Sequence, residues 1–235
     1  MRMRKKKNID KRIANCSDVM VVTPEDYKGK WSEFFDNDNP IYIEIGCGKG
    51  RFILEHARLY PNINYVAIER EENALIIATE KALNMELNNL VFLSYDALEI
   101  CKIFDENEVS RIYLNFSDPW PQRRHEHRRL THSRFLANYD VILAPFGQLH
   151  FKSDNQHLFE FSLEQFTKCG FRLQNLSLDL HKTSRFNVMT EYEKRFSEQG
   201  FRIYRVEAVR TCDVKEIPET SQDNEQDDTE ENTEE

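Results

Sequence analysis

Short apolar runs alternate with helix-period segments through the middle of this 235-residue chain. The runs that we expect to be strands are 41–45, 65–68, 90–93, 112–116 and 147–152, and the expected helices are 52–59, 74–83, 133–143 and 158–169. Strands that are apolar throughout are typical of a parallel sheet covered by helices on both faces. The pattern therefore predicts an α/β fold with a doubly wound, mostly parallel sheet.

The pattern changes near the C-terminal end of this region. Two further strands are expected at 171–180 and 203–209, on either side of a loop and a helix near 191–198. The length of the chain suits one domain with tails. We expect a single folded domain over 13–213.

Charge is unevenly distributed along the chain, whose net charge is −9. Residues 213–235 hold eleven Asp and Glu and one Lys, a net charge of −10, so the rest of the chain carries +1. An acidic, polar tail cannot bury enough apolar surface to offset its ordering entropy, so we expect 214–235 to be disordered. The basic residues at 1–12 are expected to form a flexible arm.

Cysteine usage and hydropathy indicate the compartment. The five cysteines are scattered and contain no C-x-x-C pair, which argues against a disulfide framework or a zinc ribbon. No apolar run approaches the roughly 20 residues that a membrane-spanning helix needs. The basic N-terminus is not followed by the apolar core of a secretory signal. We therefore expect a cytoplasmic protein with no membrane partner.

Acidic residues stand at or just after the ends of the predicted parallel strands. They are Glu44, Glu69, Asp96, Asp118 and Asp154. Ligands of open parallel sheets bind outside the carboxyl ends of the strands, so we expect these carboxylates to converge on one crevice. Such a crevice would repel a phosphate-rich cofactor and would suit a cationic one.

The turn after the first strand, EIGCGKG, is a candidate cofactor-binding turn. Gly46 and Gly48 permit positive φ and a close backbone approach to a ligand. The spacing differs from the dinucleotide pattern G-x-G-x-x-G, and Glu44 would meet a pyrophosphate with a negative charge. S-adenosylmethionine, which has no phosphate and carries two cations, is the expected cofactor. Glu69 would accept its ribose hydroxyls and Asp96 its adenine amino group; an unrelated α/β turn is the alternative.

The segment SDPWPQRRHEHRRL follows the fourth strand and joins an acid to a cluster of arginines. We expect Asp118 to lie beside Arg123, Arg124, Arg128 and Arg129, which would contact the phosphates of a nucleic acid. A solvated charged loop is the alternative. The histidines of this region match no H-E-x-x-H pattern, so we predict no metal.

Three elements together resemble the bacterial tRNA (guanine-N7-)-methyltransferases. They are EIGCGKG at 44–50, SDPWPQRRHEHRRL at 117–130, and a segment that runs from 179–181 to 190–193. The resemblance covers about residues 10–212. It implies a Rossmann-like class I methyltransferase fold with a seven-stranded sheet whose last strand is antiparallel. It also implies S-adenosylmethionine as methyl donor, and as acceptor the guanine at position 46 in the variable loop of tRNA.

The same resemblance assigns roles to residues. Cofactor binding falls to Glu44, Gly46, Gly48, Glu69, Asp96 and Asp118. Asp118 is also the implied catalytic residue. Substrate binding falls to Asp154, Thr190 and Glu193, together with Gln122 and the four arginines. Similar proteins usually carry Lys where this chain has Gln122, which adds no charge; Arg123 or Arg124 could supply it.

The chemistry of guanine narrows these roles. The N7 atom has a lone pair and no proton to lose, so methyl transfer needs alignment more than a strong base. The purine becomes cationic, and we expect Asp118 to stabilise that charge. Glu193 and Thr190 would contact the Watson–Crick edge, where a carboxylate accepts from N1–H and the 2-amino group. Thr190 and Glu193 also form a capping box.

Three other readings of the chain remain. The first is a methyltransferase that acts on another acceptor, and the second is a tRNA-binding protein that has lost catalysis. The third is a nicotinamide-dependent dehydrogenase, which Glu44 and the glycine spacing disfavour. The expected partner is tRNA, and the protein would be a monomer or a homodimer.

Overall fold

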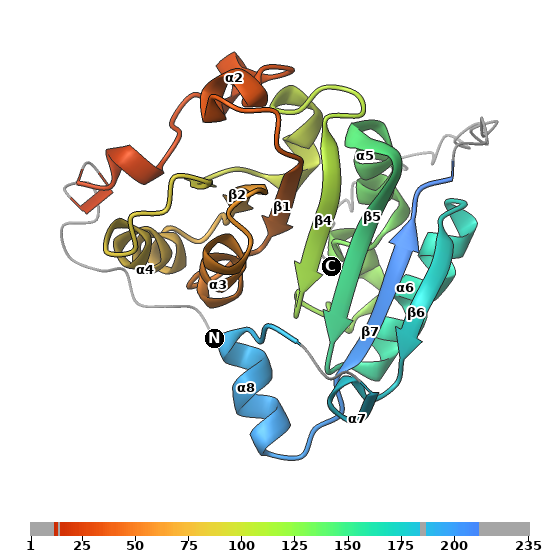
Figure 1. Cartoon of the computed structure of the whole chain (residues 1–235). Coiled ribbons are helices and arrows are strands. Elements are labelled where there is room, and N and C mark those ends of the chain that lie inside the picture. Colours follow the sequence, from red (N-terminus) through yellow and green to blue (C-terminus); the bar gives the residue numbers. More distant parts are fainter. Residues whose placement is uncertain (1–11, 14, 184–186, 212–235) are drawn as a thin grey trace, which may run out of the picture.

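A computed structural model describes residues 12, 13, 15–183 and 187–211 of the chain. Its centre is a seven-stranded sheet (Figure 1). The strands are β1 Ile41–Ile45, β2 Asn64–Ile68, β3 Leu90–Leu93, β4 Val109–Asn115, β5 Leu143–Ser153, β6 Arg172–Ser177 and β7 Tyr204–Val209. The predicted tail at 214–235, and all of the predicted arm except residue 12, lie outside the described residues.

The sheet has the order β3-β2-β1-β4-β5-β7-β6. Strands β1 to β5 pair in parallel, whereas β7 is antiparallel to both β5 and β6. The predicted doubly wound sheet with an antiparallel last strand is confirmed. Because the chain winds outward from β1 to β2 and β3 on one side and then to β4 and β5 on the other, the strand ends of β1 and β4 flank the switch point, where ligands bind in such sheets.

Helices connect the strands. The α-helices are α2 Trp31–Phe35, α3 Arg51–Leu59, α4 Glu72–Leu83, α5 Ser133–Ile142, α6 Gln156–Lys168, α7 Leu180–Thr183 and α8 Glu191–Glu198. The 3-10 helices are η1 Ser17–Val19, η2 Pro24–Tyr27, η3 Ala97–Lys102 and η4 Arg123–Arg128. Within the described part of the chain, no helix has the length and apolar character needed to cross a membrane.

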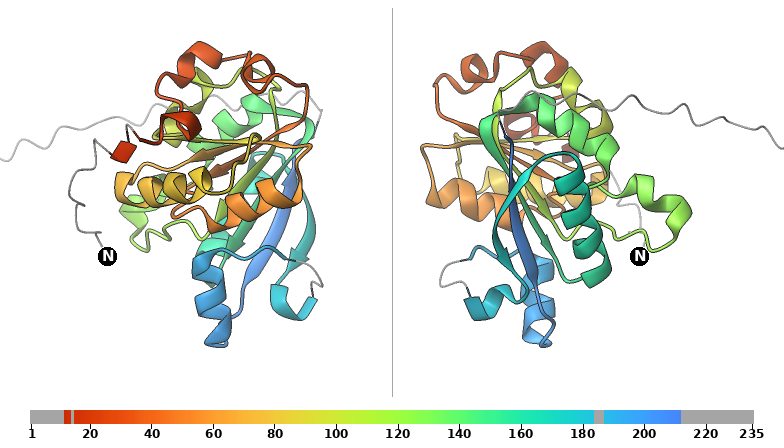
Figure 2. Two further views of the ribbon diagram at one scale, coloured as in Figure 1. Left: turned by 60° about the vertical axis from the view of Figure 1, so that its left-hand side comes forward. Right: turned by 90° about the vertical axis from the view of Figure 1, so that its right-hand side faces the viewer.

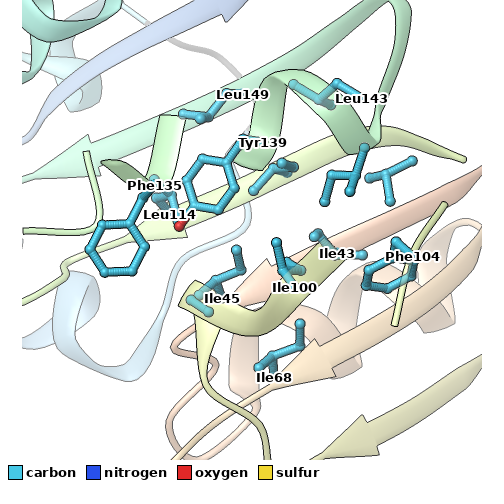
Figure 3. Close-up of a cluster of buried hydrophobic side chains, with 14 of the residues drawn as sticks. Ile43, Ile45, Ile68, Ile100, Phe104, Leu114, Phe135, Tyr139, Leu143 and Leu149 are labelled. Atoms are coloured by element: carbon cyan, nitrogen blue, oxygen red, sulfur yellow. The ribbon is translucent and has the colours of Figure 1, made fainter. Parts of the chain in front are cut away.

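The two faces of the sheet bury separate apolar clusters. Helices α3 and α4 cover one face, and α5 and α6 cover the other (Figure 2). In the second cluster, Ile43 and Ile45 of β1 pack with Ile100 of η3 and Tyr139 of α5 (Figure 3). Burial on both faces explains why these strands are apolar at successive positions rather than at every second one.

Gly50, the N-cap of α3, allows this helix to begin close to α4. Its φ is 79°, and a Cβ at this position would lie 2.7 Å from the Cβ of Ala78 in α4. A side chain here would therefore force α3 and α4 apart. The close contact therefore fixes the glycine turn and the start of α3 relative to α4.

Several elements differ from the sequence prediction. The strand expected at 171–180 ends at Ser177, and helix α7 begins at Leu180. Strand β5 begins at Leu143 rather than 147, because Leu143 pairs with Val109 before the register shifts to Arg111 and Gln148. The intervening residues form an irregular stretch that reads as a loop in the sequence. The short helix α2 was not predicted. Its Trp31 is fully buried, and its indole Nε1 donates to the Ile103 carbonyl at 2.8 Å.

Candidate functional site

A cavity of about 610 Å³ opens at the carboxyl ends of the central strands. Gly46, Glu69, Asp96 and Asp118 all line it, and they come from the ends of β1, β2, β3 and β4. Its volume lies in the range of small-molecule sites. Three of the five predicted carboxylates therefore share one cavity.

Glu69 is fixed by the backbone on both sides. One carboxylate oxygen accepts the Gly48 N–H at 2.9 Å, and the other accepts the Glu71 N–H at 2.8 Å. The glycine turn is thus tied to the end of β2. At Gly46 and Gly48, where φ is positive, an added Cβ would meet no atom within 4 Å. Open space therefore lies next to the turn, and a ligand can approach its backbone closely.

Asp96 stands at the N-terminus of η3. Its Oδ1 accepts the Leu98 N–H at 3.0 Å, and its Oδ2 lies 3.1 Å from Arg70 Nη1. The Arg70 side chain is 79% exposed, and an ion pair so exposed contributes at most about 1 kcal/mol. A ligand hydrogen-bond donor in the cavity could replace Arg70 at low cost.

Glu44 is placed differently from the expectation. It lies on the face of β1 opposite to Ile43 and Ile45, is 1% exposed, and does not line the cavity. Its Oε1 accepts the Asn115 Nδ2–H at 2.8 Å, and Oε2 has no hydrogen-bond partner among the described residues. Burial raises the pKa of this carboxyl to about 8. Burial therefore disfavours the charged form of this carboxyl.

Asp118 sits in a strained and exposed loop. Phe116 and Trp120, on either side of it, have φ of 56° and 40°, in the left-handed region that non-glycine residues rarely adopt. Such residues cost on the order of 1–3 kcal/mol each and gather at functional sites. The Phe116 N–H donates to the Lys152 carbonyl at 2.9 Å, which ties the start of the loop to β5.

Arg129 is hydrogen-bonded to the backbone of this loop. Its Nε donates to the Pro119 carbonyl at 2.9 Å and its Nη2 to the Trp120 carbonyl at 3.0 Å. The guanidinium lies 4.3 Å from the ring centroid of Phe161 in α6, and the residue is only 7% exposed. Arg129 thus differs from the expectation of a phosphate contact, because its donors face two backbone carbonyls and, at 3.4 Å from Nη1, the Glu126 carboxylate.

The other three arginines of the segment are exposed on η4. Arg124 donates to Gln122 Oε1 at 3.0 Å, and Arg128 lies 5.0 Å above the ring of Trp120. Arg128 also lines the cavity, so this rim is basic and open to solvent, together with Arg123. Among the described residues, no group of three or more His, Cys, Asp or Glu side chains is placed to hold a metal ion.

The segment 190–193 begins helix α8. Thr190 is its N-cap, and its Oγ1 accepts the Glu193 N–H at 2.9 Å, which is one of the two bonds of the expected capping box; the Glu193 carboxylate has other partners in place of the Thr190 N–H. The Glu193 side chain is fully buried. Its carboxylate contacts Lys152 Nζ at 3.1 Å, His181 Nε2 at 3.2 Å and the Asn187 amide. It therefore does not face the cavity.

Asp154 lies beside α8 rather than in the cavity. Its Oδ2 accepts the Tyr192 hydroxyl at 3.3 Å. The Tyr192 ring in turn lies 5.2 Å from the ring of Phe116, which opens the Asp118 loop. Asp154 and α8 thus stand next to this loop. Lys81 of α4 joins α8 to the glycine turn, because its Nζ lies 2.6 Å from Glu191 Oε1 and donates to the Lys49 carbonyl at 2.8 Å.

Lys152 and Asn115 were not predicted from the sequence as site residues. Lys152 is 6% exposed at the end of β5, and Asn115 is 7% exposed at the end of β4. Burial lowers the pKa of the Lys152 ammonium, and Glu193 opposes this by favouring the charged form. A lysine that ends an apolar strand is a signal that could have identified this site, since buried lysines need a partner.

The chain is similar to known proteins over most of its length. A family profile described as "Putative methyltransferase" matches residues 38–206. The chain is 48% identical over 208 residues to the tRNA (guanine-N(7)-)-methyltransferase of Bacillus subtilis (strain 168), with 88% of this chain and 98% of the relative covered. It is 49% identical over 209 residues to that of Enterococcus faecalis (strain ATCC 700802 / V583), with the same coverage.

Solved structures give the same architecture at lower identity. The 16S rRNA methyltransferase KamB matches with a TM-score of 0.59 and 13% identity, over 78% of this chain and 93% of KamB. An antibiotic-related methyltransferase matches with a TM-score of 0.58 and 20% identity, over 77% of this chain and 92% of that protein. At these identities the likeness concerns the fold alone.

Proposed function

Because this chain belongs to the tRNA (guanine-N7-)-methyltransferase family, we propose that its cavity is where S-adenosylmethionine meets a guanine of tRNA. The protein transfers a methyl group to the N7 atom of that guanine, and its cosubstrate is S-adenosylmethionine. One observation carries the assignment of the site. Asp118 shares a single cavity with Glu69 and Asp96 at the carboxyl ends of β4, β2 and β3.

The cavity suits a nucleoside that carries positive charge. Open space next to Gly46 and Gly48 admits the ligand, Glu69 would accept the ribose hydroxyls, and Asp96 would accept the adenine amino group. When bound, S-adenosylmethionine supplies the methyl group on a sulfonium cation. Glu69, Asp96 and Asp118 favour a cation placed next to them, whereas Arg70, Arg128 and Arg134 line other parts of the cavity. Glu44 would support the cofactor site from beneath the turn, through the hydrogen bond that it accepts from Asn115.

Asp118 acts on the charge that develops in the acceptor. A bond forms between N7 and the methyl carbon as the carbon–sulfur bond breaks, and no proton is lost. Positive charge therefore moves to the purine, and the Asp118 carboxylate stabilises it and orients the base. Phe116 and Trp120 hold the loop that carries Asp118 in one conformation, which favours alignment.

The tRNA would lie across the basic rim and the α8 side of the loop. Arg123, Arg124 and Arg128 contact phosphates, and their charge compensates for Gln122. Asp154 and the segment 190–193 form the opposite wall. The acceptor is the guanine at position 46 in the variable loop.

The protein would work in the cytoplasm, as a monomer or a homodimer. Its substrate, tRNA, is found there. Cys16, Cys47, Cys101 and Cys169 are free thiols, which suits a reducing compartment.

A transfer assay tests the function directly. The protein is incubated with unmodified tRNA and S-adenosylmethionine labelled in the methyl group. The product is then treated with borohydride and aniline, which cleave at 7-methylguanine. Label in tRNA with cleavage at the variable-loop guanine is expected, and labelled tRNA without that cleavage would point to a different acceptor atom or position.

Cofactor binding should depend on Glu69. The Glu69→Gln change removes the charge and one of the two acceptors for backbone N–H groups, so affinity for S-adenosylmethionine should fall about tenfold. Isothermal calorimetry measures the Kd. Glu72→Gln, an exposed change at the start of α4, is the matched control and should leave the Kd as in the wild type. An unchanged Kd in Glu69→Gln would remove Glu69 from the cofactor site.

Salt dependence should report the exposed arginines. Arg123→Gln is expected to reduce the slope of log affinity for tRNA against log salt concentration by about 1, because one phosphate contact is lost. Affinity is measured by filter binding over a series of salt concentrations. Arg58→Gln on α3, whose arginine already pairs with Glu55, should leave the slope unchanged. Equal slopes for Arg123→Gln and the wild type would mean that Arg123 is merely solvated.

A further inference from the structure

We propose that Lys152 is a positioning residue for methyl transfer, because its buried pair with Glu193 fixes helix α8 and the segment 190–193 beside Asp118. This inference rests on the proposed function, since it concerns how tRNA is held at that site. It also gives the Glu193 carboxylate a role as an anchor instead of a reader of guanine.

Helix α8 has little apolar attachment, which consists of the Tyr192 ring near Phe116 and the Phe196 ring near Phe201. The residue that α8 buries is Glu193, which is fully buried, whereas Tyr192 is 42% exposed. The Tyr192 and Phe196 rings stack on each other at 4.1 Å, within the helix. Most helices of globular proteins are held by an apolar face. The position of α8 therefore depends mainly on polar contacts.

Lys152 supplies the buried ones of these contacts, whereas the ion pair of Glu191 with Lys81 of α4, at 2.6 Å, is partly exposed. Its Nζ donates to Asn187 Oδ1 at 2.7 Å, to the Val188 carbonyl at 3.0 Å and to Glu193 Oε2 at 3.1 Å. An ammonium has three donors, and all three are used on one short segment of the chain. The segment that precedes α8 and the first turn of α8 are thus gathered around a single buried cation.

The same cation is aligned with the ends of the central strands. Asn115 of β4 is in register with Lys152 of β5, and its amide donates to Glu44 of β1 at 2.8 Å. Lys152 Nζ also lies 5.1 Å from the ring centroid of Phe52 in α3. A row of buried polar side chains therefore runs across the sheet from the strand before the glycine turn to α8. Asn115 is three residues before Asp118. These contacts therefore fix the position of α8 relative to β4, the strand that leads into the Asp118 loop.

The consequence for the site lies in Tyr192. With α8 held by Glu193, the Tyr192 hydroxyl reaches Asp154 and its ring reaches Phe116 at 5.2 Å. These two contacts place the substrate wall against the first residue of the Asp118 loop. Loss of the ion pair would release α8 and with it this wall.

Both oxygens of Glu193 already have partners. Its Oε2 accepts from Lys152, and its Oε1 accepts from Asn187 and pairs with His181 at 3.2 Å. Direct contact with the guanine edge would require these partners to be given up in a fully buried position, which is costly for a charged group. An anchor and a reader make different predictions for variants of Glu193.

The first experiment is a double-mutant cycle with Lys152→Met and Glu193→Gln. Each single change should lower kcat/KM for tRNA about tenfold, mainly through KM, while the Kd for S-adenosylmethionine stays within about twofold. The double variant should lose no more than the worse single variant, because both changes break one interaction. It also contains no unpaired buried charge, so it tests the inference even where a single variant folds poorly.

A matched control uses an exposed pair of the same chemistry. Lys168 and Glu164 of α6 lie 2.6 Å apart at the surface, and Lys168→Met with Glu164→Gln should leave both kinetic constants as in the wild type. Additive losses in the Lys152 and Glu193 cycle, or an unchanged KM for tRNA in both single variants, would overturn the inference.

The second experiment separates anchor from reader. The target guanine of the tRNA is replaced by inosine, which lacks the 2-amino group. If Glu193 is an anchor, the ratio of kcat/KM for guanine over inosine in Glu193→Gln equals that of the wild type. A ratio that falls toward one only in Glu193→Gln would make Glu193 the reader and overturn the inference. Absence of methylation by the wild type would count against the proposed function instead.

Discussion

Asp118→Asn is expected to lower kcat by about 100- to 1,000-fold, because the amide keeps the size of the side chain but not its charge. The purine acquires a full positive charge during transfer, and Asp118 is the carboxylate of the strained loop between Phe116 and Trp120. The measurement is a single-turnover assay at saturating tRNA and S-adenosylmethionine. Under saturation, any loss of cofactor affinity in this variant does not contribute to the rate.

A control for Asp118→Asn lies at the other end of the same strand. Asp105 precedes β4 and pairs with Lys28 at 3.8 Å on the surface, so Asp105→Asn should keep the wild-type rate. A wild-type kcat in Asp118→Asn would rule out charge stabilisation by this residue and leave it a role in cofactor binding alone.

Arg129→Met is expected to lower kcat about 100-fold, although Arg129 does not line the cavity. The carbonyls of Pro119 and Trp120 would lose their donor, and the strained conformation around Asp118 would no longer be held. A displacement of the carboxylate by about 1 Å is enough for a loss of this size. The rate is measured at saturating substrates, and circular dichroism melting reports whether the fold is intact.

The neighbouring arginine gives the contrast for Arg129. Arg128→Met should reduce the salt slope of tRNA binding by about 1, whereas Arg129→Met should keep the wild-type slope. Arg172→Met, an exposed change on β6, serves as the control for kcat. A reduced slope with a normal kcat in Arg129→Met would return Arg129 to the phosphate-binding rim.

The sheet and the convergence of its acids could be predicted because both follow from local pattern. Burial on both faces makes a strand apolar throughout, and parallel strands bring their carboxyl ends to one edge. Glu69, Asp96 and Asp118 therefore meet in the cavity as expected. Glu44 does not, because side chains alternate between the faces of a strand and its position points under α3.

Finer distinctions depend on contacts between distant segments. Arg128 and Arg129 are adjacent in sequence, yet one is exposed and the other is buried against Phe161 of α6. The sequence contains no local sign of that packing. Likewise the partners of Lys152 come from a segment more than thirty residues away, so the ion pair with Glu193 became visible only in the folded chain.

Helix α8 also bears on how such a fold can acquire new acceptors. Polar and ring contacts made by Glu191, Tyr192 and Glu193 attach its first turn, and no interlocking apolar face does so, so the later exposed positions of α8 can change without repacking the core. The helix is in this sense an exchangeable module that is attached at its first turn. Evolution or protein design toward a different RNA could change the exposed residues of α8 and leave the methyl-transfer residues at the strand ends intact.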